Sequence, residues 1–469
     1  MRILLISTYE LGHQPLHVAS PAARLQAAGH DVRALDLGVQ DWDDELADWA
    51  EAVAISVPMH TAMRLGLDAA RRVRDRHART PLCFYGLYAP VGRELTDGLG
   101  ARVIAGEYEQ ALVDWAADLD AGHAGTDRVV ELARGRERFL VPARDLLPPL
   151  DRYAHLEWNG ERRVAGYVET THGCAHRCRH CPVPTVYDGQ FRVVAVDTVV
   201  EDVRRLVAGG ARHLSFGDPD FLNGPGHALA VVRAVHAEFP ALTWDATVKV
   251  EHMLAHPGLW EEFAARGMLF AVSAFESTDD AQLEILDKGH TAADMAAAVA
   301  LLRRHGVEIR PSWMPFTPWA NTGHIADVFD FTIAHGLVAN TDPVQFSIRL
   351  LLPDGSLLLG HPAMTLYLGD YDSGRLSWSW GNPDPAVDDL QRRLAAIAET
   401  GVDDTTADVF LAMAAEVYPA AGRPLPDEAA VRAAAHADRP RLSEPWFCCA
   451  EPTQAQQLAV VAPPAPCCD

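Results

Sequence analysis

The chain has 469 residues, 49% hydrophobic and 22% charged, a composition that is ordinary for a globular protein and too apolar for a disordered one. Its net charge of −24 excludes a nucleic-acid backbone or an anionic membrane surface as the main partner, because both require a basic surface. No apolar run approaches the roughly 20 residues of a membrane-spanning helix. The first strand-like segment, 1–7, is too short for a signal peptide. We therefore expect a cytoplasmic protein.

The first 120 residues alternate predicted strands and helices. Buried-strand patterns occur at 2–7, 31–37, 52–57, 82–85 and 102–105. Apolar residues at helical spacing occur at 20–28, 66–76 and 109–119. Alternation of this kind predicts a parallel sheet with helices on both faces, that is, an α/β Rossmann-like domain over residues 1–125.

Residues 126–165 are mixed in composition and are interpreted as a linker with some strand. A second alternating region spans 166–360, with strands predicted at 168–171, 213–216, 243–248, 269–275, 308–314 and 344–350. Its predicted helices are 197–208, 227–238, 259–266 and 291–305. Six such repeats predict a partial (β/α)6 TIM barrel with its chemistry at the carboxyl ends of the strands. We expect a small helical region over 361–440 and little regular structure in the tail, 441–469.

Three of the eight cysteines, Cys174, Cys178 and Cys181, form a CxxxCxxC cluster directly after a predicted strand. Three thiolates on one loop can hold three irons of a cubane cluster and leave the fourth iron open. Zinc is the alternative. It usually takes four ligands, and a neighbouring histidine of the same segment (His172, His176 or His180) would have to supply the fourth.

The cysteine cluster and its position in a βα series resemble the signature of the radical S-adenosylmethionine (SAM) superfamily. The resemblance implies a 4Fe–4S cluster on Cys174, Cys178 and Cys181 that binds SAM at its open iron. One-electron reduction then cleaves SAM to methionine and a 5′-deoxyadenosyl radical. The resemblance also implies a small-molecule substrate and a flavodoxin-like or ferredoxin-like electron donor.

The same resemblance implies residues around SAM. Asp218, with Asp220 second, occupies the place of an acidic turn that binds the SAM amino group; the alternative is a plain β-turn. Glu276 and Ser277 resemble the segment that reaches the SAM carboxylate and ribose, while Ser277 can equally cap the next helix. Arg310, on the fifth predicted strand, can pair with a carboxylate.

The N-terminal region resembles the cobalamin-binding-type domain of one radical SAM class. The segment Gly106-Glu-Tyr-Glu109 before the last helix carries part of this resemblance. The Asp-x-His-x-x-Gly motif, which supplies an axial histidine to cobalt, does not occur in the chain. Cobalamin therefore stays open as a cofactor, and the alternative is a scaffold that only shapes the active site.

The tail carries two vicinal pairs, Cys448-Cys449 and Cys467-Cys468. The first pair lies in Cys-Cys-Ala-Glu-Pro, which resembles the ending of the CCAEP/CUAEP-tail radical SAM family, and Cys449 stands where relatives carry selenocysteine. Thiolates are soft ligands, so the tail can bind a soft metal, a second cluster, or an arsenic- or selenium-containing group. Alternatively, Cys449 is a redox nucleophile with Cys448 as its resolving partner.

Three functions follow from these features. The first is a radical SAM enzyme that modifies a small molecule, with the tail in soft-element binding or redox chemistry. The second is a cobalamin-dependent radical SAM methyltransferase. The third is a non-catalytic metal carrier or sensor in which both cysteine groups store or deliver metal.

Overall fold

The computed structural model describes residues 1–123, 130–133, 137–401, 404–435 and 438–444. Its N-terminal part is a sheet of parallel strands in the order β2-β1-β3-β4-β5-β6. The α/β fold predicted for this part is confirmed. The strands are β1 (Arg2–Ser7), β2 (Asp31–Asp36), β3 (Ala52–Ser56), β4 (Leu82–Tyr85), β5 (Arg102–Gly106) and β6 (Val130–Ala133). Because β6 lies in the predicted linker, that segment extends the sheet.

Helices cover both faces of this sheet because successive strand residues point to opposite sides and both sets are apolar. Leu4 and Ile6 pack with the helix α3 on one face, and Ile3 and Leu5 pack with α1 and α5 on the other. The helices of this part are α1 (Leu16–Ala27), α2 (Asp44–Trp49), α3 (His60–Arg76), α4 (Arg93–Gly98) and α5 (Tyr108–Asp120).

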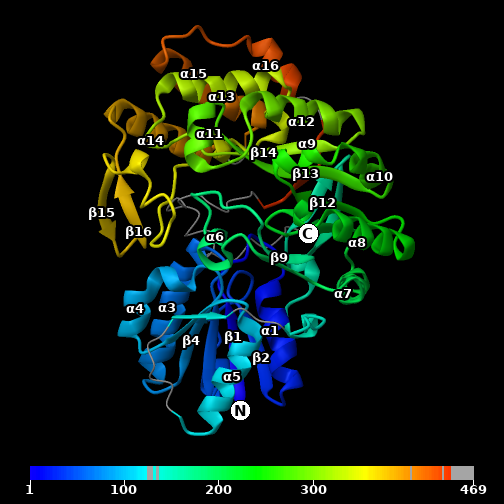
Figure 1. Cartoon of the computed structure of the whole chain (residues 1–469), viewed down its shortest axis with the longest axis vertical. Coiled ribbons are helices and arrows are strands. Elements are labelled where there is room, and N and C mark those ends of the chain that lie inside the picture. The colour runs from blue at the N-terminus through cyan, green and yellow to red at the C-terminus, as the bar shows by residue number, and fades with distance from the viewer. Residues whose placement is uncertain (124–129, 134–136, 402–403, 436–437, 445–469) are drawn as a thin grey trace.

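The second sheet has the order β14-β13-β12-β11-β8-β7-β17 and curls into an open half-barrel (Figure 1). Neighbours from β8 to β14 are parallel, whereas β7 and β17 extend the edge antiparallel. The strands are β7 (His155–Trp158), β8 (Glu161–Val168), β11 (His213–Phe216), β12 (Thr243–Thr247), β13 (Met268–Glu276), β14 (Glu308–Trp313) and β17 (Arg441–Leu442). The partial barrel expected from the sequence is confirmed.

The helices of the half-barrel follow its strands and form the large hydrophobic core behind the sheet. Four of them, α7, α8, α10 and α12, match the predicted helices within a few residues. The helices are α7 (Val196–Ala208), α8 (Pro225–Glu238), α9 (Val250–Ala255), α10 (Trp260–Ala265), α11 (Asp280–Leu286), α12 (Ala292–Arg304) and α13 (Thr322–Ala334).

Two predicted strands of this region are wrong. The segment 168–171 is not a strand, because β8 ends at Val168 and the chain bends before the short strand β9 (Thr171–Gly173), which pairs antiparallel with β10 (Phe191–Val193). The segment 344–350 begins as a 3-10 helix, Pro343–Ser347, since proline fixes φ and favours the first turn of a helix. Beyond it, Arg349 forms an isolated bridge to Phe316.

The rest of the chain packs around the half-barrel. A hairpin of β15 (Leu368–Asp372) and β16 (Ser377–Trp380) precedes the helices α14 (Pro385–Thr400), α15 (Thr406–Ala420) and α16 (Glu428–Ala435). The predicted helical region is therefore correct in its second half, whereas the hairpin was not anticipated. Among the described residues, none of the helices combines the length and apolarity needed to cross a bilayer.

A buried ion pair joins the two parts of the molecule. Arg144 donates to both carboxylate oxygens of Asp202 on α7, at 3.0 and 2.8 Å, and to the carbonyl of Tyr167 on β8 at 2.7 Å. Its third nitrogen lies 3.4 Å from the carbonyl of Gln14, in the loop after β1. The side chains of Arg144 and Asp202 are only 7% and 6% exposed, so neither charge is solvated by water.

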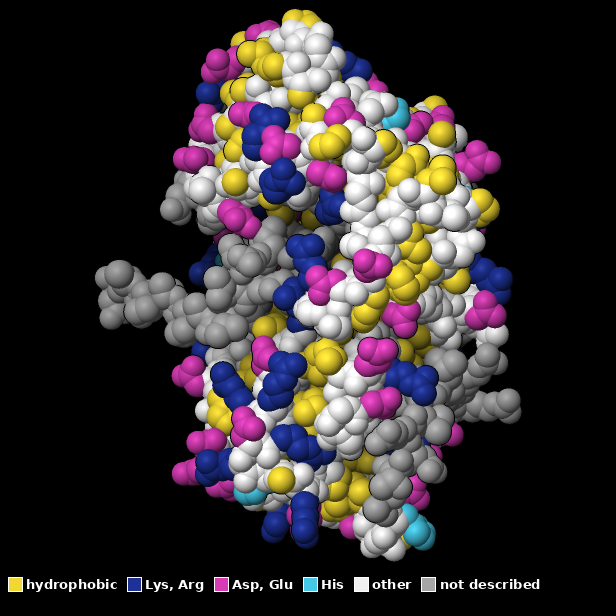
Figure 2. All heavy atoms as spheres, turned by 90° about the vertical axis from the view of Figure 1, so that its left-hand side faces the viewer, with side chains coloured by type: hydrophobic (Ala, Val, Ile, Leu, Met, Phe, Trp, Pro, Cys, Tyr) yellow, Lys and Arg dark blue, Asp and Glu magenta, His cyan; other side chains and the backbone are white. Residues whose placement is uncertain are grey.

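Replacing Arg144 by Ala should lower the free energy of unfolding by about 3–5 kcal/mol, because Asp202 would then be a buried charge without its partner. The matched control is Arg138→Ala, which breaks the ion pair with Asp197, whose side chains are 67% and 71% exposed. On the surface in Figure 2, basic and acidic side chains are interspersed, and exposed pairs of this kind contribute less than about 1 kcal/mol. Urea denaturation of both variants measures the difference, and equal destabilisation would contradict the role given to Arg144.

Candidate functional site

The carboxyl ends of the two sheets face each other (Figure 1). Side chains from both sheets line a cavity of ≈ 270 Å³ between them. The N-terminal part contributes the loops that follow β1, β3, β4 and β5, and the half-barrel contributes the ends of β8 and β11 to β14. Ligands of parallel α/β sheets bind at this edge, because the loops there converge on one place. The lining from the N-terminal part includes Glu10, Leu11, His13, His17, Pro58, Met59, Leu87, Tyr88 and Tyr108.

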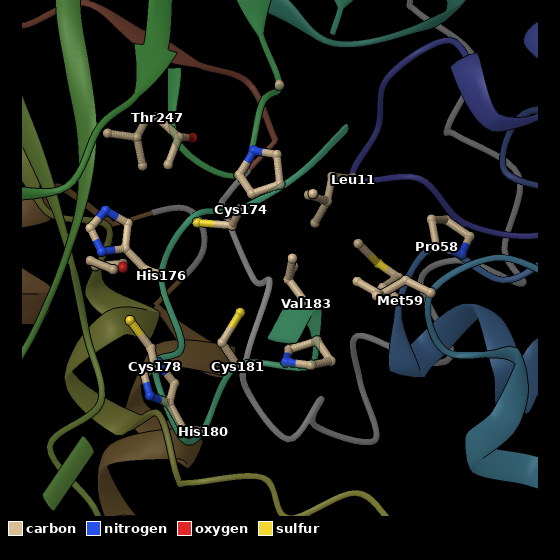
Figure 3. Close-up of a pocket in the computed structure, with 18 of the residues that line it drawn as sticks. Leu11, Pro58, Met59, Cys174, His176, Cys178, His180, Cys181, Val183 and Thr247 are labelled. Atoms are coloured by element: carbon tan, nitrogen blue, oxygen red, sulfur yellow. The ribbon is translucent and has the colours of Figure 1, made fainter. Parts of the chain in front are cut away.

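The three cysteines of the CxxxCxxC cluster line this cavity from the loop between β9 and the short helix α6 (Val183–Tyr187). Figure 3 shows their sulfur atoms around one common space. Cys174 and Cys178 are buried and Cys181 is half-buried. Burial raises the pKa of Cys174 to about 12. Burial also raises the pKa of Cys178, where Lys288 and Lys249 oppose the shift.

This donor set fits a 4Fe–4S cluster. Three soft thiols come from one loop, and the side opposite the loop is open cavity. Two nearby ammonium groups, Lys249 and Lys288, favour the thiolate forms that a cluster requires. The geometry does not favour a zinc site completed by a histidine of the same segment, because His172, His176 and His180 lie against Glu107, Asp220 and Glu276.

Asp218 does not line the cavity. Its side chain is fully buried and accepts hydrogen bonds from the backbone N–H and hydroxyl of Thr170, both at 2.6 Å, and from the hydroxyl of Thr171 at 2.7 Å. Burial raises its pKa to about 6 against these hydrogen bonds. Both oxygens hold the bend that leads into the cysteine loop, and the contact with a SAM amino group stays a prediction from the sequence.

Asp220 also lies outside the cavity lining. Its Oδ1 accepts the N–H of Leu222 at 3.1 Å and caps the 3-10 turn Phe221–Asn223, whereas its Oδ2 lies near His176 and His252. The sequence motif thus places its two aspartates in two different environments, neither of them an open position at the cavity.

Glu276, at the end of β13, is the one residue of the five expected around SAM that lines the cavity. Its Oε1 accepts hydrogen bonds from Lys288 Nζ at 3.2 Å and from His180 Nε2 at 3.1 Å. Burial alone would raise the pKa of Glu276, but Lys288 and His180 outweigh it and lower the pKa to about 2. The residue also adopts a φ of 65°, an unusual backbone conformation for a glutamate and typical of functional sites.

Ser277 and Arg310 do not reach the main cavity. The Ser277 hydroxyl accepts the N–H of Asp279 at 3.1 Å, and Asp279, not Ser277, caps α11. Arg310 pairs with Asp342 at 2.7 Å and lines a separate cavity of ≈ 30 Å³. Cys448 and Cys449 lie outside the described residues.

A second polar cluster at the cavity was missed by sequence reasoning. His172 lies 3.3 Å from both Glu107 and Glu169, and these carboxylates raise its pKa to about 10 against the effect of burial. Burial raises the pKa of Glu169 to about 7. His17 bonds to Tyr108 at 2.5 Å and faces Glu169 at 3.4 Å, which links the two sheets. The dense run of ionisable residues directly after the first strand was the available signal, because that edge of a parallel sheet binds ligands.

The N-terminal edge offers a mainly apolar and aromatic surface to the cavity, which fits the face of a flat macrocycle such as a corrin. The lining there includes Leu11, Met59, Leu87 and Tyr88. His17 also lines this edge. One of its ring nitrogens contacts Tyr108 and the other contacts Glu169. The surface therefore fits cobalamin bound without a ligand from His17.

Comparison with known proteins agrees with the cysteine geometry. The family model of the radical SAM superfamily matches residues 168–320. The hopanoid C-3 methylase of Methylococcus capsulatus is 24% identical over 328 residues, which cover 65% of this chain and 62% of that protein. The chain thus spans less than two thirds of this relative.

Two solved structures share the fold. The cobalamin-dependent SAM radical enzyme OxsB, solved with aqua-cobalamin and SAM, aligns with a TM-score of 0.68 and 12% identity over 85% of this chain and 67% of that chain. The radical SAM methyltransferase TsrM from Kitasatospora setae, solved with cobalamin and a 4Fe–4S cluster, aligns with a TM-score of 0.55 and 17% identity over 71% of this chain and 70% of that chain. Both structures share with this chain the arrangement of an N-terminal parallel sheet followed by a half-barrel.

Asp218→Asn should lower the free energy of unfolding by about 1.5–3 kcal/mol and weaken retention of a bound cluster, since a charged hydrogen-bond acceptor of the Thr170–Thr171 bend is lost. Asp279→Asn is the matched control, because asparagine caps a helix as well as aspartate. Urea denaturation and iron content of the purified proteins measure both effects. Unchanged stability together with weaker SAM binding would instead return Asp218 to the role expected from the sequence.

Proposed function

We propose that this chain, which belongs to the radical SAM superfamily, is an enzyme that reductively cleaves SAM at a 4Fe–4S cluster and modifies a small molecule by radical chemistry. One observation carries the proposal: Cys174, Cys178 and Cys181 surround one space at the wall of a cavity that both sheets enclose. Three protein thiolates are the ligand number that leaves one iron for an outside ligand.

When bound, such a cluster would supply an electron and an open coordination position on one iron, to which SAM can bind. The residues of the chain then have separable tasks. Lys249 and Lys288 offset the negative charge of the thiolates, and the Lys288–Glu276–His180 network fixes the end of β13 against the cysteine loop. Glu276, which faces the cavity, is the residue we assign to contact with SAM.

The rest of the cavity is the proposed substrate site. Its wall combines apolar side chains from the N-terminal part with ionisable groups such as Glu10, His17 and Glu169. Binding sites for small molecules have this mixture, because apolar walls bury the ligand and a few polar groups orient it. Enclosure between two sheets also keeps water away from a reactive intermediate. The electron donor that we propose is a flavodoxin-like or ferredoxin-like protein.

We further propose that the tail thiols act at this cavity. Glu444, the last described residue, lines the smaller cavity together with Leu11 and His13, and these two residues also line the main cavity. Cys448 and Cys449 follow four and five residues later, and an extended chain spans about 13–18 Å over that distance. Vicinal thiols at that position suit binding of a soft element such as arsenic or selenium, or thiol redox chemistry.

A second candidate is a cobalamin-dependent radical SAM methyltransferase. The fold likeness to OxsB and TsrM and the mainly apolar N-terminal edge of the cavity favour it. The two candidates differ in what they require: the first needs no corrinoid, whereas the second binds one and uses SAM as a methyl source.

Anaerobic reconstitution, reduction in the presence of SAM and identification of the nucleoside product test the proposal. The wild type should hold four irons per chain and release 5′-deoxyadenosine, and each of the three Cys→Ala variants at positions 174, 178 and 181 should lose both properties, because no ligand is spare. Cys83→Ala, in the core of the N-terminal sheet, is the control and should retain both. Full iron loading without one of the three cysteines would refute the site, while bound corrinoid with S-adenosylhomocysteine as product would establish the second candidate.

Cys449→Ser should leave cluster content and SAM cleavage unchanged and weaken binding of arsenite at least tenfold, because serine keeps the shape of cysteine but is a poor soft ligand. The matched control, Cys83→Ser, alters a buried thiol in the other part of the molecule and should leave arsenite binding unchanged. Equilibrium dialysis with arsenite measures the affinity. Equal arsenite binding by wild type and by a chain that ends before Cys448 would refute the role of the tail.

A further inference from the structure

Two histidines and one aspartate from successive segments of the half-barrel converge at the cysteine loop. The function proposed above assigns no role to them. His176 lies between Cys174 and Cys178, Asp220 follows β11, and His252 is on α9 after β12. One ligand atom from each lies within 4.8 Å of the other two. Asp220 is fully buried, and the two histidine side chains are only 16% and 18% exposed.

The distances from His176 Nε2 to its two neighbours are close to the spacing of ligands around one metal ion. The Nε2 atoms of His176 and His252 are 3.3 Å apart, and His176 Nε2 is 3.5 Å from Asp220 Oδ2. Ligand bonds of about 2.0–2.1 Å in a tetrahedral site place neighbouring ligand atoms roughly 3.3 Å apart. Asp220 Oδ2 lies 2.6 Å from the other ring nitrogen of His252, Nδ1. Because one imidazole supplies one nitrogen to an ion, either Nδ1 or Nε2 of His252 would be the ligand.

The buried carboxylate of this group requires a positive partner. Asp220 Oδ2 lies 2.6 Å from His252 Nδ1 and 3.5 Å from His176 Nε2. Two histidines around one buried carboxylate oxygen can be held together by a bound cation, which supplies the positive charge without protonating either ring. The other oxygen, Oδ1, is already engaged with the N–H of Leu222, so Oδ2 alone is available as a ligand.

The loops that carry the group are held in place independently of any ligand. Asn223 accepts the N–H of Ala175 at 3.0 Å and donates to the carbonyl of Gly173 at 3.3 Å, which ties the turn after Asp220 to the loop that carries His176. Glu251 Oε2 lies 3.6 Å from His176 Nδ1, on the side away from Asp220. A carboxylate behind a histidine ligand is the usual outer partner in metal sites.

We propose that His176, Asp220 and His252 bind one divalent first-row transition-metal ion, of the Zn²⁺ or Fe²⁺ class, distinct from the iron–sulfur cluster. Two imidazoles and one carboxylate are the donors that such ions take in proteins, with further coordination positions left open. Because His176 itself lines the main cavity, those open positions lie beside the cysteine loop. The site requires neither SAM nor a cleavage reaction.

The test uses the full chain with the cluster reconstituted and the four tail cysteines, at 448, 449, 467 and 468, replaced by serine, so that tail thiols do not compete. After removal of loosely bound metal by a chelator, Zn²⁺ is titrated and the bound zinc is measured by atomic emission. We expect one equivalent of zinc. His252→Gln and Asp220→Asn should each weaken zinc binding at least tenfold, since each removes one of three ligands.

His256→Gln is the matched control, because its ring is 6.0 Å from that of His252 but outside the group, and it should bind zinc as the parent does. Equal zinc in the parent and in His252→Gln, or equal loss in His256→Gln, would overturn the proposal. Co²⁺ provides a readout that does not depend on variants: the parent should show the visible bands of nitrogen- and oxygen-ligated cobalt, and their absence overturns the site. Sulfur-to-cobalt charge-transfer absorption would instead reveal a vacant cysteine triad, which is a failure of the proposed function and not of this site.

Discussion

The pairing of buried charge between the two sheets is the constraint on which this structure depends. Carboxylates from both parts face one enclosed space, and an unpaired charge there would cost several kcal/mol. The buried charges are paired accordingly. Arg144 donates two hydrogen bonds to Asp202, and His172 lies between Glu107 and Glu169. Because the Arg144–Asp202 and His172–Glu107 pairs join segments that are far apart in sequence, the electrostatic requirement also contributes to how the two sheets meet.

The same requirement shapes the cysteine loop. Each of its three histidines anchors the loop to a different wall of the cavity: His172 to Glu107 and the end of β8, His176 to the turn after β11, and His180 to Glu276 at the end of β13. A loop held from three sides keeps its thiols in one arrangement before any cofactor arrives. Such preorganisation reduces the entropy that binding must overcome.

Sequence patterns predicted the features that short segments determine by themselves. They missed the features that depend on contacts between distant segments. The strand β4 was predicted with its exact bounds, because a continuous apolar run between Pro81 and Gly86 admits few alternatives. The cysteine spacing likewise carries its chemistry locally. By contrast, Asp218 and Asp220 lie two residues apart in one turn, and only the fold determines that one faces Thr170 and the other His252. The predicted strand at 344–350 failed because Pro343 begins a helical turn that buries Phe346.

The chain has two lysines against 38 arginines, and both lysines, Lys249 and Lys288, line the cavity beside the cysteines. The chemistry of the two cations explains why arginine would serve less well there. An ammonium is a compact point charge that can approach several acceptors from different directions, whereas a guanidinium is planar and best satisfied by a fork of coplanar oxygens. Lys288 is fully buried against Glu276 and lowers the pKa of Cys178. Lysine at these two positions therefore supplies positive charge beside the cysteine loop without the fixed fork geometry that a guanidinium requires.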